Sequence, residues 1–514
     1  MTDPKARPLP SLGVEIEMPV IDDSGATGMV DERYFTALQA RRGADARAEI
    51  LGARTVAITS PLAVSGIDNG WNLLETAHAP VPAGQGGLTL LARRMRDDMA
   101  DVGAALAAQG LRLTSLAQHP TAGCGAGLYR RAVAPKPVYD YLTARRGWTH
   151  AAGIDAKAQN GPTTGAHPDG AVTALNLMLA AAPAFIALFA NSPFENGRRS
   201  GLMETRMTLW PRMVASSRFP ADGARVGLPP RWFTSLGDYF AWTFAPGTVM
   251  QAVPAGSGSY KGSTALFEPG DGRMNAMCFL AGGPVAGRAV QAGTRTLVTP
   301  GAAHFEFLQW SNFLDFRLRF AFAPPGPGAE EVSAALADPV RFLPLFRDHA
   351  NNLYIENRCA GATFADADLA ARAPPAAQAS CMIAPLALQA GLMAAAPLEG
   401  AAFCARWPVA RVARLRTQAI RAGLTPDPSG DTSGLAGTLH AFCREVLELA
   451  RANLSAADRG HLAYADWVLD TGLTGAQRAI DHRARLGRAG EGAAGLQRLA
   501  RAREAVPPPP PDHG

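Results

Sequence analysis

A run of 17 mostly apolar residues, 174–190, constrains the fold of this chain more than any other segment. Asn176 and Pro183 interrupt the run, which is shorter than the ~20 apolar residues that a helix needs to cross a bilayer. A second apolar run, 381–397, is interrupted by proline and glutamine in the same way. A helix that is apolar on every side has to be buried. We therefore predict a helix at residues 171–190 inside a large hydrophobic core.

The composition of the chain supports a large folded protein and excludes several other classes. Of the 514 residues, 47% are hydrophobic and 18% are charged, which excludes disorder for most of the chain. The formal net charge of +5 is small for this length and does not indicate a dedicated nucleic-acid binder. The six cysteines include no C-x-x-C pair, and the first residues contain no apolar signal segment. We expect a cytoplasmic protein that binds small molecules, and neither nucleic acid nor membrane.

The patterns along the chain predict one catalytic body followed by a helical layer. No sharp linker divides residues 1–395, so we expect them to form a single body. Residues 396–505 are rich in Ala, Arg and Leu with helical periodicity, and residues 506–514 form a proline-rich tail. The alternation of residues predicts strands at 13–21, 73–76, 111–116, 202–210, 294–298, 313–322 and 354–358, and the apolar spacing predicts a further helix at 88–109.

Two carboxylates in the first predicted strand form the first candidate site. Glu15 and Glu17 are two residues apart, so their side chains point to the same face of a strand. Carboxylates crowded on one face repel each other unless water or a cation lies between them, and such oxygen ligands suit magnesium. The alternative is an edge strand whose carboxylates face solvent.

Two further strand segments carry candidate residues. Glu75 lies among apolar residues, where a carboxylate is costly to bury without a partner; a surface position is the alternative. Glu356 and Arg358 share one face of a predicted strand. They form either a simple salt bridge or a metal-holding carboxylate beside a guanidinium that binds phosphate.

The segment after the apolar helix contains two arginines of interest. Residues 191–198, Asn-Ser-Pro-Phe-Glu-Asn-Gly-Arg, close the helix and lead toward Arg206. The segment is either a turn with solvated arginines or a loop that delivers Arg198 and Arg206 to an anionic substrate. The sequence contains neither G-x-x-x-x-G-K-[ST] nor G-x-G-x-x-G after a strand. A nucleotide, if one is used, is therefore expected to be held through magnesium ions bound by carboxylates.

Taken in order, these segments resemble the glutamate–cysteine ligase family found in proteobacteria and plants, which is related to the broader carboxylate–amine ligases. The most specific segment, 187–198, is similar to the family's A-L-F-A-N-S-P-F-x-x-G-R and continues to Arg206 and Trp210 like its S-x-R-x-x-x-W. The weaker matches are 13–17 with G-x-E-x-E, 69–80 with G-G-Q-x-E-L-S-x-A-P, 114–121 with a stretch ending H-P-T, 304–318 with a segment ending P-E-V-R-L, and 354–358 with Y-L-E-x-R.

The resemblance implies a fold and an activity. The implied fold is α+β and similar to glutamine synthetase: a curved antiparallel sheet forms a funnel, helices flank it, and the C-terminal region is helical. In the implied reaction, ATP with Mg²⁺ phosphorylates the side-chain carboxylate of glutamate. The amine of cysteine then attacks the acyl phosphate, which is the first step of glutathione synthesis.

The resemblance also assigns roles to individual positions. The implied metal ligands are Glu15, Glu17, Glu75 and Glu356. Arg358 and Arg206 are the implied catalytic residues, and the implied cofactor-binding residues are Arg198, Arg317 and Gln159.

The chain also departs from the family pattern. Gln159 takes the place of a polar ligand in a segment where Lys157 and Pro162 are unusual, and Gln309 stands at the position of a family histidine. Residues 320–353 have almost no counterpart in the family. These departures leave open the acid and the amine, so a related carboxylate–amine ligase with another substrate pair is one alternative. A non-catalytic binding protein with the same fold is a second.

One cysteine has a charged neighbour in the sequence. The cysteines are scattered singly among mostly apolar neighbours, which favours a structural role. Cys359 follows Arg358, and because a guanidinium can lower the pKa of a nearby thiol, Cys359 is the one candidate for redox sensitivity.

Overall fold

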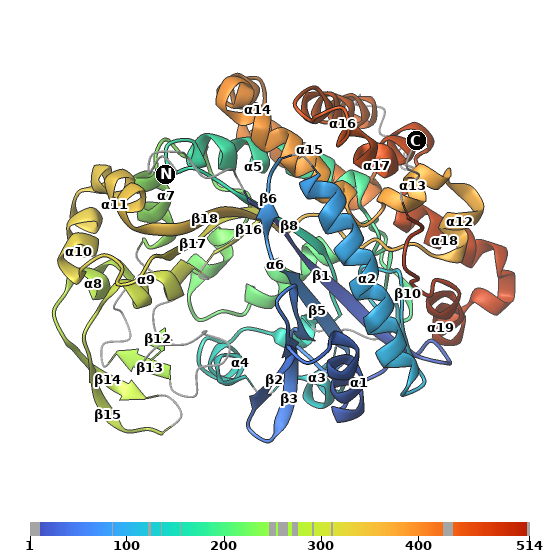
Figure 1. The fold of residues 1–514 in the computed structure, drawn as a ribbon, viewed down its shortest axis with the longest axis horizontal. Coiled ribbons are helices and arrows are strands. Elements are labelled where there is room, and N and C mark those ends of the chain that lie inside the picture. The colour runs from blue at the N-terminus through green and yellow to red at the C-terminus, as the bar shows by residue number, and fades with distance from the viewer. Residues whose placement is uncertain are drawn as a thin grey trace.

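Strand β1, Ser11–Asp22, is the centre of a large antiparallel sheet (Figure 1). Its alternating sequence places Val14, Ile16 and Met18 in the core and Glu15 and Glu17 on the opposite face. Hydrogen-bonded neighbours run in the order β17–β18–β8–β1–β5–β4–β3–β2, and β6 and β7 also pair with β1. The predicted α+β fold with a large antiparallel sheet is therefore confirmed.

The other strands of this sheet are short and come from distant parts of the chain. In this computed structural model the described residues are 11–84, 86–121, 125–134, 136–154, 156–245, 253–254, 266–269, 276–289, 292–309, 312–424 and 435–510. The strand bounds are β2 Arg47–Leu51, β3 Arg54–Thr59, β4 Ala63–Ile67, β5 Leu73–His78, β6 Val81–Pro82, β7 Leu111–Leu113, β8 Asn160–Gly165, β17 Phe316–Phe322 and β18 Ala350–Asn357.

The register of the strands gathers charged side chains on one face of the sheet. Glu17 in β1 lies directly opposite Glu75 in β5, and Glu15 lies opposite Gly161 in β8. Two residues further along β8, Thr163 lies opposite Glu356 in β18, which in turn lies opposite Arg317 in β17. Directly paired residues point to the same side of a sheet. The predicted carboxylates therefore share one face.

Helices cover the other face. The apolar run forms α5, Ala171–Leu188, as predicted, and it packs against α14, Ala384–Arg406. Gln389 of α14 donates to Thr164 Oγ1 (2.8 Å) and to the Ile355 carbonyl (3.1 Å), which fixes α14 on the face opposite the carboxylates. Both helices are long and apolar enough to cross a membrane by length and composition, but 89% of the apolar window of α5 is buried inside the protein.

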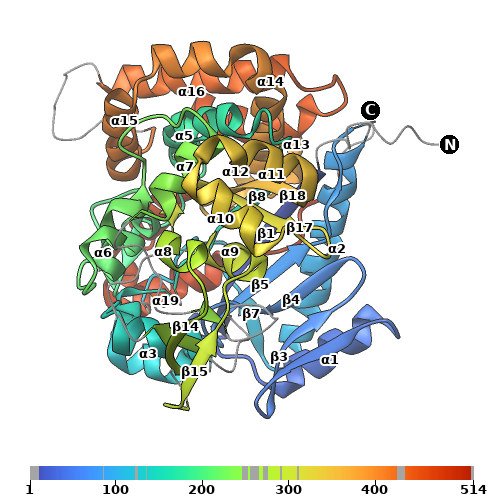
Figure 2. The same ribbon diagram turned by 90° about the vertical axis from the view of Figure 1, so that its left-hand side faces the viewer.

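Further helices extend these layers. Figure 2 shows α5 and α14 stacked with α15, Val409–Ala422, and α16, Leu435–Ala452, above the sheet. Helices α1, Glu32–Arg42, and α2, Gly87–Ala107, cover the strands of the N-terminal half. Other α-helices are α3 Ala126–Ala132, α6 Leu209–Val214, α7 Leu236–Thr243, α8 Ala276–Ala281, α9 Ala302–Leu308, α12 Ala367–Arg372 and α13 Pro375–Ser380. A small separate sheet contains β12 Val253–Pro254, β13 Leu266–Pro269, β14 Val285–Ala289 and β15 Arg295–Val298.

The structure corrects one predicted strand, at residues 202–210, and shows how residues 320–353 fold. The strand predicted at 202–210 is wrong: the segment forms a 3₁₀ turn, Thr205–Thr208, followed by α6. The two charged residues that suggested a polar strand face, Glu204 and Arg206, do not face solvent. They form an ion pair with each other inside the protein. Residues 320–353 begin in β17 and end in β18, and between the two strands they form the helices α10 Ala329–Ala337 and α11 Phe342–His349.

The C-terminal helices return the chain to the main sheet. After α17 Ala463–Thr471, α18 Gly475–Arg485 and α19 Gly492–Ala502, the Ala505 amide donates to the Leu113 carbonyl of β7 (2.9 Å). Asp366, at the start of α12, links this region to the body, because it accepts from Arg478 Nη1 (3.1 Å) and Arg503 Nε (2.6 Å). All three side chains are fully buried.

We expect the Asp366→Asn variant to lose ~3–5 kcal/mol of unfolding free energy at neutral pH, because it removes the carboxylate bound by Arg503 and leaves Arg478 with only Asp368, 3.5 Å away, as its counter-charge. Burial opposes ionisation of Asp366, but Arg503 and Arg478 hold its pKa well below the usual range. The ionised Asp366 carboxylate therefore stabilises the folded state above the pKa that this group has in the unfolded chain, and the stabilisation is lost as the pH falls toward the lower folded-state pKa. The difference in unfolding free energy between the wild type and Asp366→Asn should therefore shrink in acid. Denaturant unfolding at several pH values measures this.

The control for Asp366 is an ion pair of the same type at the surface. Asp338 and Arg341 form an i,i+3 pair with half or more of each side chain exposed. Asp338→Asn should change the unfolding free energy by less than ~1 kcal/mol. An Asp366→Asn variant as stable as Asp338→Asn would contradict the role of the buried cluster.

Candidate active site

A cavity of about 450 Å³ lies on the charged face of the main sheet. This volume falls within the range of roughly 300–1,000 Å³ that is usual for small-molecule sites. The sequence-predicted residues that line it are Glu15, Glu17, Glu75, Gln159, Arg317, Glu356 and Arg358. The cavity is also lined by Asp68, Tyr139, Trp148, His150, Lys157, Trp210, Phe313 and Arg319. Arg198 and Arg206 do not line this cavity.

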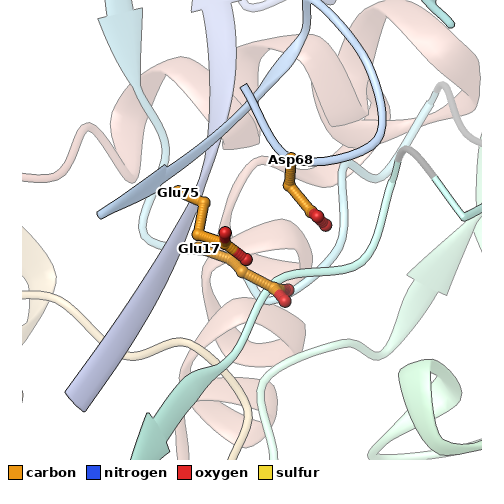
Figure 3. A group of neighbouring side chains, drawn as sticks. All are labelled: Glu17, Asp68 and Glu75. Carbon is orange, nitrogen blue, oxygen red and sulfur yellow. The ribbon is translucent and has the colours of Figure 1, made fainter. Parts of the chain in front are cut away.

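One side of the cavity is acidic. Glu17, Asp68 and Glu75 each offer a carboxylate oxygen, and these oxygens all lie within 4.8 Å of one another (Figure 3). Glu17 and Glu75 meet across the β1–β5 pair, and Asp68 follows directly after β4. The Lys157 ammonium donates to Glu17 Oε1 (3.0 Å) and Asp68 Oδ2 (3.4 Å).

The environment of Glu17 tests whether this cluster fits a metal ion. Burial raises the pKa of Glu17 to about 7, and the nearby Asp68 and Glu75 carboxylates add to this effect, while Lys157 opposes it. Glu17 Oε2 is buried and accepts no hydrogen bond from the described part of the chain. A divalent cation would satisfy this oxygen and relieve the repulsion, and Mg²⁺ prefers oxygen ligands of this kind. The acidic cluster therefore fits such an ion.

The other side of the cavity is basic and is organised by one carboxylate. Glu356 accepts from Arg317 Nε (3.1 Å) and Nη2 (2.9 Å) and from Arg358 Nη1 (2.9 Å), and Arg319 Nε lies 3.5 Å from Oε2. Burial disfavours the charge on Glu356, yet the three guanidiniums hold its pKa well below the usual range. Both oxygens of Glu356 contact guanidinium groups, and Glu356 is not part of the acidic cluster.

Aromatic side chains connect the two sides. Trp210 stacks on Phe313 with ring centroids 4.1 Å apart, and the Arg358 guanidinium lies 4.8 Å from the Trp210 ring centroid. This contact between the guanidinium and the Trp210 ring favours a position of Arg358 at the wall of the cavity. His150 contacts Tyr139 and Trp148 edge-on, and burial lowers its pKa to about 4, so it is neutral at pH 7.

Arg206 is buried behind the cavity, where it positions the backbone that carries Arg358. It donates from Nη1 to the Arg358 carbonyl (3.0 Å) and from Nη2 to the Cys359 carbonyl (2.7 Å). Its Nη1 also lies 3.4 Å from Gln159 Oε1, and its Nε donates to Glu204 Oε1 (2.9 Å). The predicted catalytic contact of Arg206 with substrate does not match this placement, because its donors face backbone carbonyls and a buried carboxylate.

The Asn-Ser-Pro segment holds Arg206 in place. The Asn191 side-chain amide donates to the Ser115 carbonyl (2.5 Å) and the Ala362 carbonyl (2.7 Å). Ser192 Oγ accepts from the Arg206 amide (3.0 Å). This segment, which is the most distinctive in the sequence, is therefore a structural junction between the end of α5 and the strand end that carries Arg358.

Two expectations from the sequence differ from what is observed. Arg198 is exposed in a small hairpin of β9, Phe194–Glu195, and β10, Arg198–Arg199, outside the cavity, which does not support its predicted contact with the cofactor. The predicted low pKa of the Cys359 thiol is wrong, because complete burial raises that pKa well above its ordinary value despite the neighbouring arginines.

Sequence reasoning also missed several residues of the cavity. Asp68 stands at the end of a short strand in a Gly-Ile-Asp-Asn-Gly sequence, and only its pairing next to β5 reveals its proximity to Glu75. Arg319 lies two residues after Arg317 on the same strand face, a spacing that could have identified it. The sequence marks Lys157 only as a departure from the family pattern and does not predict its contact with Glu17 and Asp68.

Comparison with known proteins gives a family match and structural matches over nearly the whole chain. The family model described as Glutamate-cysteine ligase family 2 (GCS2) matches residues 11–499. The crystal structure of a glutamate–cysteine ligase from Francisella tularensis in complex with AMP shares 10% sequence identity at a TM-score of 0.51, covering 97% of this chain and 88% of that one. A bifunctional glutathione synthetase from Pasteurella multocida shares 11% identity at a TM-score of 0.43, covering 96% of this chain and 52% of that one. No curated protein matches the chain.

Proposed function

The chain belongs to glutamate-cysteine ligase family 2, and from this premise we propose that it joins the side-chain carboxylate of glutamate to the amine of cysteine at the expense of ATP. The observation that carries the proposal is the division of one cavity into an acidic cluster and an arginine cluster. A nucleotide–metal complex needs both: carboxylates for the ion and guanidiniums for the phosphates.

The acidic side of the cavity is the proposed metal site. Glu17 and Glu75 would hold Mg²⁺, with Glu15 beside them on the same strand face. When bound, the ion would neutralise charge on the phosphate oxygens of ATP. The sheet positions these side chains before any ligand arrives, because their spacing is fixed by backbone hydrogen bonds between β1 and β5. We keep Glu356 out of this set because its oxygens already contact arginines.

The basic side of the cavity is the proposed site of phosphoryl transfer. A carboxylate oxygen of glutamate attacks the γ-phosphorus of ATP, and ADP leaves. Arg317, Arg319 and Arg358 would hold the negative oxygens of the group in transit, since guanidinium groups match phosphate geometry. The amine nitrogen then attacks the acyl carbon, orthophosphate leaves with the bridging oxygen, and the amine gives up a proton.

The walls of the cavity would protect the acyl phosphate from hydrolysis. The Trp148 and Trp210 rings both pack against Phe313 along one wall. Apolar walls of this kind exclude water, which otherwise competes with the amine for the activated carboxyl group.

A second candidate is a carboxylate–amine ligase of the same family that acts on another acid or amine. Lys157 favours it, because this cation lies in the acidic part of the cavity and departs from the family pattern. Gln309, a second departure, bonds the backbone of Phe320 through Nε2 (2.9 Å) and Oε1 (2.8 Å).

The deciding experiment measures phosphate release from Mg²⁺–ATP with glutamate, with and without cysteine, together with the mass of the product. Cysteine-dependent release and a γ-glutamylcysteine mass would establish the proposed reaction. ATP consumption with glutamate alone, and no dipeptide, would favour the second candidate and a screen of other amines. No release under either condition would contradict glutamate as the donor acid.

A further inference from the structure

Lys157 places its positive charge at one corner of the acidic cluster. Its ammonium contacts one oxygen of Glu17 and one oxygen of Asp68, at 3.0 Å and 3.4 Å, and its side chain is only 5% exposed. A backbone bridge to Gln118 fixes the position of its main chain. The ammonium therefore contacts two of the three carboxylates of the acidic cluster, and the other oxygen of Glu17 accepts no hydrogen bond from the described residues.

The choice of lysine at this position is unusual for this chain. Of its 49 lysine and arginine residues, only Lys5, Lys136, Lys157 and Lys261 are lysines. Elsewhere buried carboxylates are paired with arginine, as Asp366 is with Arg478 and Arg503. Arginine presents a planar fork, whereas lysine presents a compact point charge that resembles a small cation in size and position.

We propose that the Lys157 ammonium is a built-in monovalent cation at the Glu17–Asp68 corner of the acidic cluster. It leaves room for one divalent ion at Glu17 Oε2 and Glu75, and it excludes a second ion that Asp68 would otherwise bind. The inference rests on the proposed function only in one respect, namely that the bound divalent ion serves the ligase reaction. Ion binding itself is measured without ATP, glutamate or amine.

The experiment counts Mn²⁺ ions bound to the full-length protein by electron paramagnetic resonance in the absence of nucleotide. Lys157→Met removes the charge and keeps a side chain of similar length, so the variant should bind one more equivalent of Mn²⁺ than the wild type. The added Mn²⁺ should also raise the melting temperature of the variant more than that of the wild type, because a ligand that binds the folded state stabilises it.

Asp68 provides a second and independent test. Because Asp68 is committed to Lys157, Asp68→Asn alone should leave the wild-type Mn²⁺ count unchanged, whereas Glu75→Gln should lower it by one. In the double variant Lys157→Met/Asp68→Asn, the ion gained by Lys157→Met should be lost again. The Asp68→Asn result decides the question even if Lys157→Met fails to fold.

Lys136 provides the matched control. It is a buried lysine beside the same loop, and it donates to the backbone carbonyls of Ile67 (3.3 Å) and Asp68 (2.5 Å). Lys136→Met should leave the Mn²⁺ count unchanged. The proposal is overturned if Lys157→Met binds as many ions as the wild type, if Lys136→Met gains an ion as well, or if Asp68→Asn alone loses one. None of these counts depends on the amine used, so the proposed reaction can fail while this inference stands.

Discussion

Replacement of Glu356 by Gln should lower kcat of the proposed ligase by at least ~100-fold. Glu356 holds three guanidiniums together, and its removal leaves Arg317, Arg319 and Arg358 without the charge that opposes their mutual repulsion. Catalytic groups displaced by about 1 Å can lose this much activity. The measurement is the phosphate-release rate at saturating ATP and glutamate, on protein shown by circular dichroism to be folded.

The same substitution should change how the protein responds to an anion. With its internal counter-charge gone, the arginine cluster should bind inorganic phosphate more tightly, so phosphate should raise the melting temperature of Glu356→Gln more than that of the wild type. A direct metal ligand at this position would instead predict a loss of Mn²⁺ binding and no gain in phosphate binding. The two measurements therefore separate the role implied by the family resemblance from the one that the observed contacts support.

Glu195 provides the control for Glu356. It pairs with Arg212 through both oxygens (2.6 and 3.0 Å) but does not line the cavity. Glu195→Gln should leave kcat within about twofold of the wild type, since Glu195 and Arg212 both lie outside the cavity. A Glu356→Gln variant with comparable activity would contradict the importance of the arginine cluster.

The sequence predicts the elements of this fold better than it predicts their neighbours. The alternation in β1 identifies a strand because every second residue is apolar and buried, and the mostly apolar run in α5 identifies a buried helix because all its sides are apolar. The pairing of Glu17 with Glu75 is not visible in the same way, since it depends on the register between strands more than 50 residues apart. Asp68 was missed for that reason: it reaches the cluster only because β4 lies beside β5.

Residue roles were harder to predict than residue positions. The local pattern of Glu356 and Arg358 allowed either a salt bridge or a metal ligand, and the observed 2.9 Å contact is the salt bridge. Arg317 and Arg319 complete that cluster from another strand, across a connection that contains α10 and α11. The sequence could not reveal this convergence, because the connection is long and matches no family segment.

Replacement of Arg206 by Met should lower the unfolding free energy by ~3–5 kcal/mol, because Glu204 would remain buried with an uncompensated charge. Burial already raises the pKa of Glu204, and Arg206 is its charged partner. The variant also frees the Arg358 and Cys359 carbonyls from their donors. We therefore expect a lower kcat even at temperatures where the variant is folded, since the backbone that carries Arg358 is no longer held.

Arg206→Lys separates these two effects, because it restores the charge opposite Glu204 but cannot reproduce the guanidinium bonds to both carbonyls. Its stability should lie closer to the wild type than that of Arg206→Met, while its kcat stays low. Arg198→Ala is the matched control: its side chain is exposed outside the cavity, so stability and kcat should both stay close to the wild type. If Arg198→Ala instead raised the KM for ATP or glutamate severalfold, the hairpin of β9 and β10 would have to move to the cavity during the reaction, and the contact implied by the family resemblance would be restored.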